Sequence, residues 1–268
     1  MQCTVEILSI GNELLLGNTV NTNASWIASR VTALGGKVTR ITTVADNLNG
    51  ISQTIREALR RKPDFLITTG GIGPTFDDMS LKGVARALHL RIRVDKNAVE
   101  MLRAHYARRF PNQRIPLTKP RLKMASIPTS STPILNPVGS APGVRLTAHA
   151  TEIFCLPGVP SEAKAIFQDT VSKAIKARSK GTVFVEKWFR VRGVPESSLA
   201  PEVSGVMRRW RGVYIKSHPR GIDVNGRPKI ELHLSIASEK PREARSIVHS
   251  AAKDIRKRLI VLGAQVKP

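Results

Sequence analysis

The feature that most constrains the fold is a short apolar run that leads directly into a glycine-rich loop and two acids, at residues 64–80. Phe65 to Ile67 is long enough for a buried strand, and flexible and hydroxyl residues follow it at once. This order predicts a strand, a tight loop and a helix from about Ser80 to Leu88. Because glycine has no Cβ, the loop backbone can come within hydrogen-bonding distance of a ligand.

The loop has the composition of a phosphate-binding turn. Its N–H groups and the positive end of a following helix dipole would face an anion. Asp77 and Asp78 would repel a phosphate unless a cation such as Mg2+ lay between, so they predict a phosphate site with a metal. Alternatively, Thr75 or Asp77 only caps the helix and Asp78 favours its dipole. The candidate phosphate contacts in the loop are Thr69, Gly70, Gly71, Gly73 and Thr75.

Strand and helix patterns alternate around this loop, which predicts an α/β fold with a parallel sheet covered on both faces. Residues 4–10 and 37–44 are expected strands, each followed by a helix. Ligands bind such sheets where loops leave the carboxyl ends of strands. The turn at residues 11–13 is therefore expected to share a pocket with the glycine-rich loop. Glu13 then becomes a third candidate carboxylate; as an alternative, it is a solvated turn residue.

Two later segments repeat this chemistry. Residues 136–143 could present backbone N–H groups to a ligand, or could form only a turn before a strand at 144–146. A buried strand at 152–156 is followed by a Gly/Pro loop and a helix, the same order of elements as around the glycine-rich loop of residues 64–80. The candidate contacts in these segments are Gly139, Ala141, Gly143, Pro157 and Gly158.

The charge is strongly positive and unevenly distributed. The net charge is +23, and residues 171–268 hold 22 basic and 8 acidic residues. Such a balance attracts polyanions, including nucleic acid and phosphorylated metabolites. Enrichment in Lys and Arg is also typical of thermophilic proteins, which is the alternative explanation.

The character of the chain changes near residue 172, so we expect two domains, at 1–172 and 173–268. The second should be a smaller α+β domain with one sheet covered by helices, as in the KH group. It lacks the Gly-x-x-Gly clamp of KH modules, and aromatic residues are sparse. Nucleic-acid binding therefore rests on charge alone, and we expect it to be weak and unspecific.

Composition gives three further expectations. Cys3 and Cys155 are too few for a disulfide framework or a zinc site and should be buried thiols. No apolar run approaches the roughly 18 residues of a membrane span, so we expect a cytoplasmic protein without a membrane partner. One helix face predicts a homodimer interface or, alternatively, the core of the second domain. That face consists of Leu199, Val203, Val206 and Trp210.

Several motifs stand in the order typical of the competence/damage-inducible protein CinA family. They are Gly11-Asn12-Glu13-Leu14-Leu15-Leu16-Gly17, Asn21-Thr22-Asn23, Thr69-Gly70-Gly71-Ile72-Gly73-Pro74-Thr75-Phe76-Asp77-Asp78, Asn136-Pro137 with Gly139-Ser140-Ala141-Pro142-Gly143, and Leu156-Pro157-Gly158-Val159-Pro160-Ser161-Glu162. The resemblance covers about residues 1–170 strongly and the remainder more weakly. It implies a three-layer α/β/α molybdopterin-binding fold and an oligomeric protein. It also adds Gly11, Asn12, Asn21, Asn23 and Pro74 to the candidate substrate contacts.

This resemblance implies two different functions. Molybdopterin-binding relatives bind a pterin phosphate and adenylylate it or insert metal. CinA proteins have been linked to metal-dependent hydrolysis of ADP-ribose and similar nucleotide pyrophosphates. We therefore expect an Mg2+-dependent pyrophosphatase for ADP-ribose-like or FAD-like diphosphates, with Asp77, Asp78 and Glu13 as catalytic residues and the two aspartates as metal ligands.

The alternative is a molybdopterin-binding protein of molybdenum cofactor biosynthesis without hydrolysis. Longer members of the family carry a deamidase domain for nicotinamide mononucleotide. That domain is not expected here, because the chain ends before one would fit.

Overall fold

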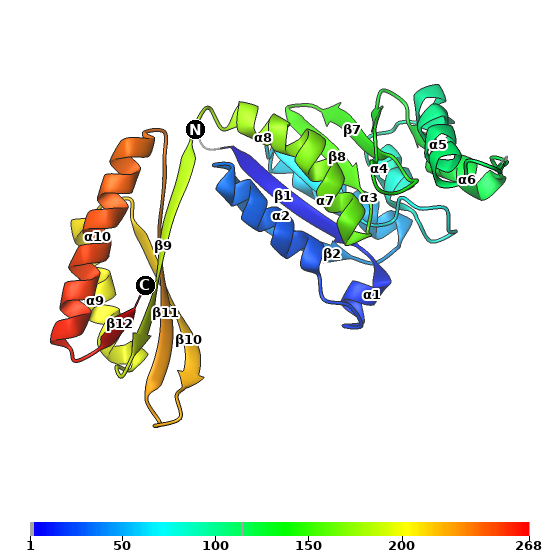
Figure 1. Cartoon of the computed structure of the whole chain (residues 1–268). Coiled ribbons are helices and arrows are strands. Elements are labelled where there is room, and N and C mark those ends of the chain that lie inside the picture. The colour runs from blue at the N-terminus through cyan, green and yellow to red at the C-terminus, as the bar shows by residue number, and fades with distance from the viewer. Residues whose placement is uncertain (1–2, 114, 268) are drawn as a thin grey trace. The chain divides into compact units, whose positions relative to one another are not determined.

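The computed structural model describes residues 3–113 and 115–267 (Figure 1). The chain divides into two compact units between Ser179 and Lys180. The boundary that the sequence predicts, after residue 172, lies a few residues before the boundary in the structure. The difference arises because helix α8 (Ser172–Arg178) belongs to the first unit, where its Ile175 is fully buried in the core.

A six-stranded sheet forms the centre of the first unit, in the order β2-β1-β3-β8-β7-β6. Strands β1, β2, β3 and β8 are parallel, and β7 and β6 extend the sheet in antiparallel pairs. A separate antiparallel pair joins β4 and β5. The strands are β1 Thr4–Ile10, β2 Lys37–Val44, β3 Phe65–Thr69, β4 Ile92–Val94, β5 Ser126–Pro128, β6 Thr132–Ile134, β7 Gly143–Ala148 and β8 Thr151–Leu156.

Helices cover both faces of this sheet, as the alternating pattern predicts (Figure 1). Leu8 and Ile10 of β1 face one core, with residues of α3 and α4. Val5 and Ile7 face a second core, with residues of α2, α7 and α8. The three-layer α/β/α fold is therefore confirmed. The helices are α1 Asn12–Leu15, α2 Thr22–Ala33, α3 Leu48–Arg60, α4 Ser80–Ala87, α5 Lys96–Arg109, α6 Lys119–Met124, α7 Pro160–Ile166, the π-helical turn η1 Phe167–Val171, and α8.

Both cysteines lie in the core of the first unit, as expected. Cys3 and Cys155 are free and buried. Burial raises the pKa of each thiol to about 11. The reactive thiolate is therefore scarce at neutral pH, which fits a packing role for both side chains.

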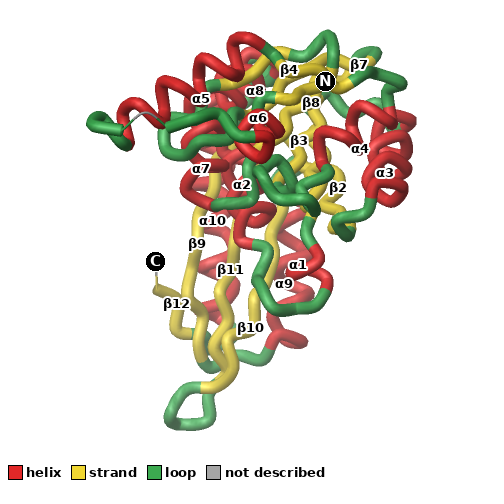
Figure 2. Tube along the Cα trace, turned by 90° about the vertical axis from the view of Figure 1, so that its right-hand side faces the viewer, coloured by secondary structure: helices red, strands yellow, loops and turns green. Residues whose placement is uncertain are grey.

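The second unit is an antiparallel four-stranded sheet in the order β10-β11-β9-β12, with two helices (Figure 2). Its succession of elements is that of the split β-α-β-β-α-β motif. The predicted α+β unit is confirmed, and the short strand β12 adds an edge that the sequence did not indicate. The elements are β9 Val183–Arg192, α9 Glu196–Arg209, β10 Tyr214–Ile222, β11 Pro228–Ser238, α10 Pro241–Val261 and β12 Gln265–Lys267. Within the described ranges, no helix has the length and apolar character needed to span a membrane.

The helix face expected at a dimer interface belongs to the core of this unit. Leu199 and Val206 are fully buried, and Val203 and Trp210 pack against the same cluster. The indole Nε1 of Trp210 donates a hydrogen bond to Asp254 Oδ2 at 3.0 Å. These four residues therefore belong to the core of the second unit, which was the alternative interpretation. The homodimer remains a prediction, but this helix face no longer supports it.

Gly83 of α4 marks the tightest approach of α3 and α4, because an added Cβ would lie 2.3 Å from Ile51 Cγ2. We predict that Gly83→Ala lowers the free energy of unfolding by about 1–3 kcal/mol through overpacking. Gly205→Ala in α9 is the matched control, since its Cβ would meet only Arg258, at 3.2 Å from Nη1, a far milder contact than that at Gly83. Better helix propensity should raise stability there by about 0.5–1 kcal/mol. Denaturant unfolding measures both; an unchanged stability of Gly83→Ala would contradict the tight contact.

Candidate functional site

The parallel strands release their loops at one edge of the sheet, as the sequence predicts. In the strand register, Ser9 pairs with both Thr43 and Thr69, and Thr69 pairs with Leu156. The loops after these strands surround a cavity of about 390 Å³. The predicted site residues in its wall are Gly11, Glu13, Gly70, Gly71, Gly73, Pro74, Thr75, Asp77, Asp78, Ala141, Pro157 and Gly158.

Gly70 occupies the most crowded point of this wall. Its φ is +97°, and an added Cβ would lie 2.2 Å from the carbonyl oxygen of Ile10. Its N–H donates to the carbonyl of Leu156 at 3.0 Å, and a Cβ on Gly158 would lie 3.4 Å from Gly70 Cα. The backbone at the ends of three strands therefore meets at Gly70. Only glycine permits so close an approach at this position, because any side chain would clash with the Ile10 carbonyl.

The start of α4 is tied to this point. Ser80 Oγ donates to the carbonyl of Gly70 at 2.6 Å, and the Ser80 N–H donates to the carbonyl of Gly71 at 2.9 Å. Neither Thr75 nor Asp77 caps the helix, because α4 begins only at Ser80 and its N-cap, Met79, makes no side-chain cap bond. The capping alternative for these two residues is therefore wrong.

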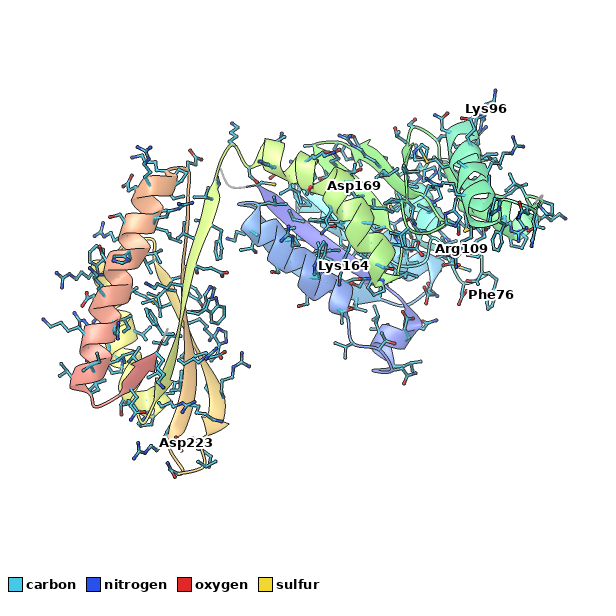
Figure 3. All side chains as sticks on the ribbon, viewed as in Figure 1. Phe76, Lys96, Arg109, Lys164, Asp169 and Asp223 are labelled. Carbon is cyan, nitrogen blue, oxygen red and sulfur yellow. The ribbon has the colours of Figure 1, made fainter. Side chains whose placement is uncertain are left out.

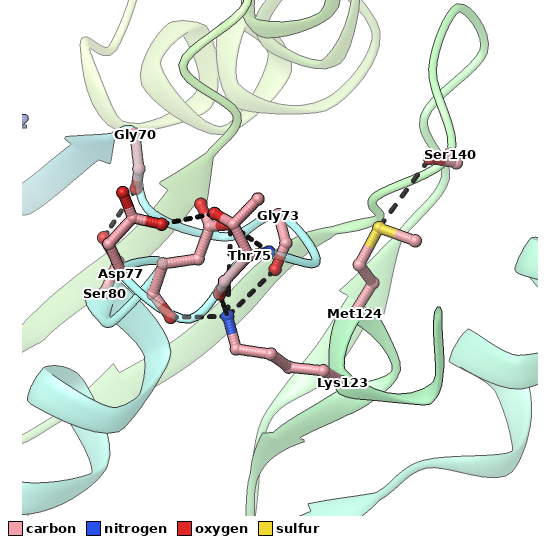
Figure 4. Close-up of polar contacts among 9 residues, drawn as sticks. Gly70, Gly73, Thr75, Asp77, Ser80, Lys123, Met124 and Ser140 are labelled. Carbon is pink, nitrogen blue, oxygen red and sulfur yellow. Dashed lines mark hydrogen bonds and ion pairs between the residues drawn. The ribbon is translucent and has the colours of Figure 1, made fainter. Parts of the chain in front are cut away.

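Lys123 of α6 fastens the loop from outside the cavity wall (Figure 4). Its Nζ donates to the carbonyls of Gly73 at 3.1 Å and Asp78 at 2.8 Å, and also to that of Thr75. Burial lowers the pKa of Lys123, and the nearby Asp78 opposes this shift. One partly buried ammonium thus offsets three carbonyl dipoles of the loop.

The two predicted acids are held by the loop itself. The Thr75 hydroxyl contacts the carboxylates of both Asp77 and Asp78, and the Thr75 N–H donates to Asp78 Oδ2 at 2.8 Å. Hydrogen bonds from the Thr75 hydroxyl and from the Asp77 N–H lower the pKa of the exposed Asp77 carboxyl. Phe76, between Thr75 and the acids, is 87% exposed and projects from the loop (Figure 3). Thr75 therefore fixes both carboxylates at the rim of the cavity.

Asp46 is a site residue that sequence reasoning missed. It follows β2, so it reaches the same edge as the turn after β1. The Asn12 N–H donates to Asp46 Oδ2 at 2.8 Å, and the Asp46 N–H donates to Asn12 Oδ1 at 3.3 Å. Burial raises the pKa of Asp46, the Asn12 N–H opposes this, and the carboxylates of Glu13, Asp77 and Asp78 raise it further. Met124, Ser140, Val159 and Glu162 also line the cavity and were not among the candidates.

Three predicted contacts lie beside the main cavity. Asn21, Asn23 and Thr69 line an adjoining hollow of about 100 Å³, which shares Glu13, Gly70 and Gly158 with the main cavity. Asn21 caps α2 by accepting from the Ala24 N–H. The Asn23 side chain donates to the Gly158 carbonyl at 2.7 Å, and its buried Oδ1 has no partner among the described residues.

Two predicted glycine contacts lie outside the cavity wall. A Cβ on Gly139 would lie 2.1 Å from the Glu162 carboxylate, and its N–H donates to Asn136 Oδ1 at 2.8 Å. Gly143 begins β7, where it is buried and a Cβ would lie 3.3 Å from both the Cys155 carbonyl and Ile166. Both glycines fit a packing role, because the space above each is already filled.

The cavity does not contain a ready cage for a metal ion. Among the described residues, no three or more His, Cys, Asp or Glu side chains are grouped so that they could hold a cation. Asp77 and Asp78, the predicted ligands, share the Thr75 hydroxyl. The metal site predicted at these two aspartates therefore remains an expectation.

Comparisons with known proteins agree with this fold. Residues 6–177 match a family model described as a probable molybdopterin binding domain. A protein of Metallosphaera sedula is 41% identical over 256 residues, which cover 96% of this chain and 94% of that one. A protein of Pyrobaculum aerophilum is 43% identical over 246 residues, with coverages of 92% and 90%.

A solved structure also matches the chain. The crystal structure of the protein CinA, of unknown function, from Thermoplasma acidophilum is 40% identical with a TM-score of 0.59. The match covers 64% of this chain and 98% of that one. Because the family model spans more than half of the chain and the likeness to these relatives is strong, the chain belongs to the family of probable molybdopterin binding domains and is a CinA-like protein.

Proposed function

We propose that the cavity of the first unit binds a phosphorylated pterin of the molybdopterin type. The observation that carries this proposal is the meeting of side-chain-free glycine backbone and fixed carboxylates in one cavity of about 390 Å³. This volume lies within the range usual for small-molecule sites. The family match of residues 6–177 supports the same ligand class.

The phosphate end of the ligand fits the glycine-rich loop. Gly70, Gly71 and Gly73 present backbone to the cavity. Lys123 engages the carbonyls of residues 73, 75 and 78, which reduces their repulsion of an anion and adds a positive charge behind the loop. Electrostatic attraction through a partly buried loop is screened less than attraction at the surface.

The heterocycle fits the acidic part of the wall. A pterin presents ring N–H and amino donors, and ionised carboxylates only accept hydrogen bonds. Glu13, Asp77 and Asp78 supply such acceptors around the cavity, whereas Asp46 already accepts from the Asn12 N–H. An anion without N–H donors would meet these carboxylates with repulsion only. The acids therefore favour a ligand that combines a phosphate with a donor-rich ring.

Metal-dependent hydrolysis of ADP-ribose-like or FAD-like diphosphates is the second candidate. The observation in its favour is that four carboxylates line the cavity. Mg2+ is often held by one or two carboxylates together with substrate phosphates, so it could enter with the substrate. No group of three ligands stands ready for it among the described residues, which places this reaction second.

Calorimetric titration separates the two candidates. We predict that molybdopterin binds the protein at least about ten-fold more tightly than ADP-ribose or AMP, because the pterin offers both ring N–H and amino donors to the acids, whereas adenine offers only its amino group. Each ligand is titrated with and without Mg2+, and release of AMP from ADP-ribose is followed in parallel. Tight binding of ADP-ribose that requires Mg2+, with release of AMP, would overturn the ranking.

The raised pKa of Asp46 predicts how binding depends on pH. A bound phosphate adds negative charge near this carboxylate and raises its pKa further, so binding takes up protons. Affinity for molybdopterin should therefore increase as pH falls toward the pKa of Asp46. Asp46→Asn keeps an oxygen for the Asn12 N–H and should reduce this dependence. Titrations between pH 8 and about 5 test it; an equal pH dependence in both proteins would contradict the assignment.

A further inference from the structure

The sheet of the second unit has one covered face and one open face. Side chains alternate along each strand, and the inward set packs with α9 and α10 in the core. The outward set is polar, basic and aromatic, although the unit has few aromatic residues. On the three longer strands it includes Phe184, Glu186, Trp188 and Arg190 of β9, Tyr214, Lys216, His218 and Arg220 of β10, and Glu231 and His233 of β11.

Three rings form a continuous cluster across the open face. Trp188 pairs with His233 in the strand register, and their rings stack with centroids 4.1 Å apart and planes 13° apart. His218 lies 5.6 Å from Trp188 with an angle of 28° between the ring planes. Trp188 remains 44% exposed, and Tyr214, also on this face, is 54% exposed. A contiguous exposed apolar cluster with a polar rim is typical of an interaction site.

Positive charge surrounds this cluster. The two acids of the face are paired: Glu231 with Arg220 at 2.8 Å and Glu186 with His233 at 2.9 Å. Within the described part of the chain, Arg190 and Lys216 have no ion-pair partner. A hollow of about 360 Å³ lies beside Trp188 and is lined by Arg190 and Arg220. Residues 180–268 hold 19 basic and 8 acidic residues, so the whole unit attracts anions.

We propose that this open face binds single-stranded nucleic acid, with bases stacked on the Trp188 cluster and phosphates at Arg190 and Lys216. Stacking platforms beside basic side chains are the means by which proteins bind single strands. Four-stranded sheets that recognise RNA place their stacking aromatics on such an open face. A duplex fits poorly, because its bases are already stacked on one another. The site is separate from the cavity proposed for the pterin.

Fluorescence anisotropy of labelled ten-nucleotide RNA and DNA strands tests the proposal on the full-length protein. We expect Trp188→Leu to weaken binding of the strand by about 5- to 150-fold, the usual effect of losing one stacking residue. Trp188→Phe keeps an aromatic ring and should stay within about three-fold of the original protein. The RNA and DNA arms identify the preferred strand. Unchanged affinity in Trp188→Leu, or equal affinity for duplex DNA, would overturn the proposal.

Intrinsic fluorescence gives a readout that does not depend on the folding of Trp188→Leu. A strand stacked on Trp188 should quench the fluorescence of the original protein, whereas Trp188→Phe should bind the strand with little quenching. Equal quenching in both proteins would contradict stacking at this residue.

The charge of the face is tested by a matched pair of variants. Arg190→Gln should reduce the slope of log affinity against log salt by about one, as expected for one lost phosphate contact. Arg256→Gln on the exposed side of α10 removes the same charge elsewhere and should leave the slope nearly unchanged. Equal effects of the two variants would show that net charge alone drives binding and would overturn the role of this face.

Discussion

The close approach of three strand ends at Gly70 is the constraint on which the candidate site depends. The backbone there lies against Ile10 on one side and Gly158 on the other, and its N–H is bonded to Leu156. A side chain at this position would force β1, β3 and β8 apart. Because no side chain is present, the wall of the cavity is made of backbone from segments more than 50 residues apart in sequence.

The electrostatics of the cavity follow from this geometry. The loop at residues 73–78 curls around Lys123, which places positive charge behind it, while Glu13, Asp46, Asp77 and Asp78 face the cavity. The raised pKa of Asp46 reflects this concentration of carboxylates in a partly buried place. The site therefore favours a ligand with an anionic end and hydrogen-bond donors at the other end. A phosphorylated heterocycle has both features, whereas a simple anion has only the first.

Sequence reasoning succeeded where the signal was local. The run from Phe65 to Gly73 predicts a strand and a glycine-rich turn because both depend on neighbouring residues. Asp46 and Lys123 were missed because their roles arise from sheet adjacency and from a contact across about 50 residues. The sequence left Trp210 either at a dimer interface or in the core, because helical periodicity cannot separate a core from an oligomer face. The aromatic cluster on β9, β10 and β11 was hidden because its members become neighbours only when the strands pair.

The most direct measurement of the central claim is calorimetric titration of molybdopterin into Gly158→Ala. The new methyl would meet only Gly70 Cα at an ordinary 3.4 Å, so the fold should persist while the methyl narrows the space between the two loops. We predict unchanged thermal unfolding and at least about ten-fold weaker binding, a change of about 1.4 kcal/mol. An unchanged dissociation constant in a folded Gly158→Ala protein would contradict binding between these loops.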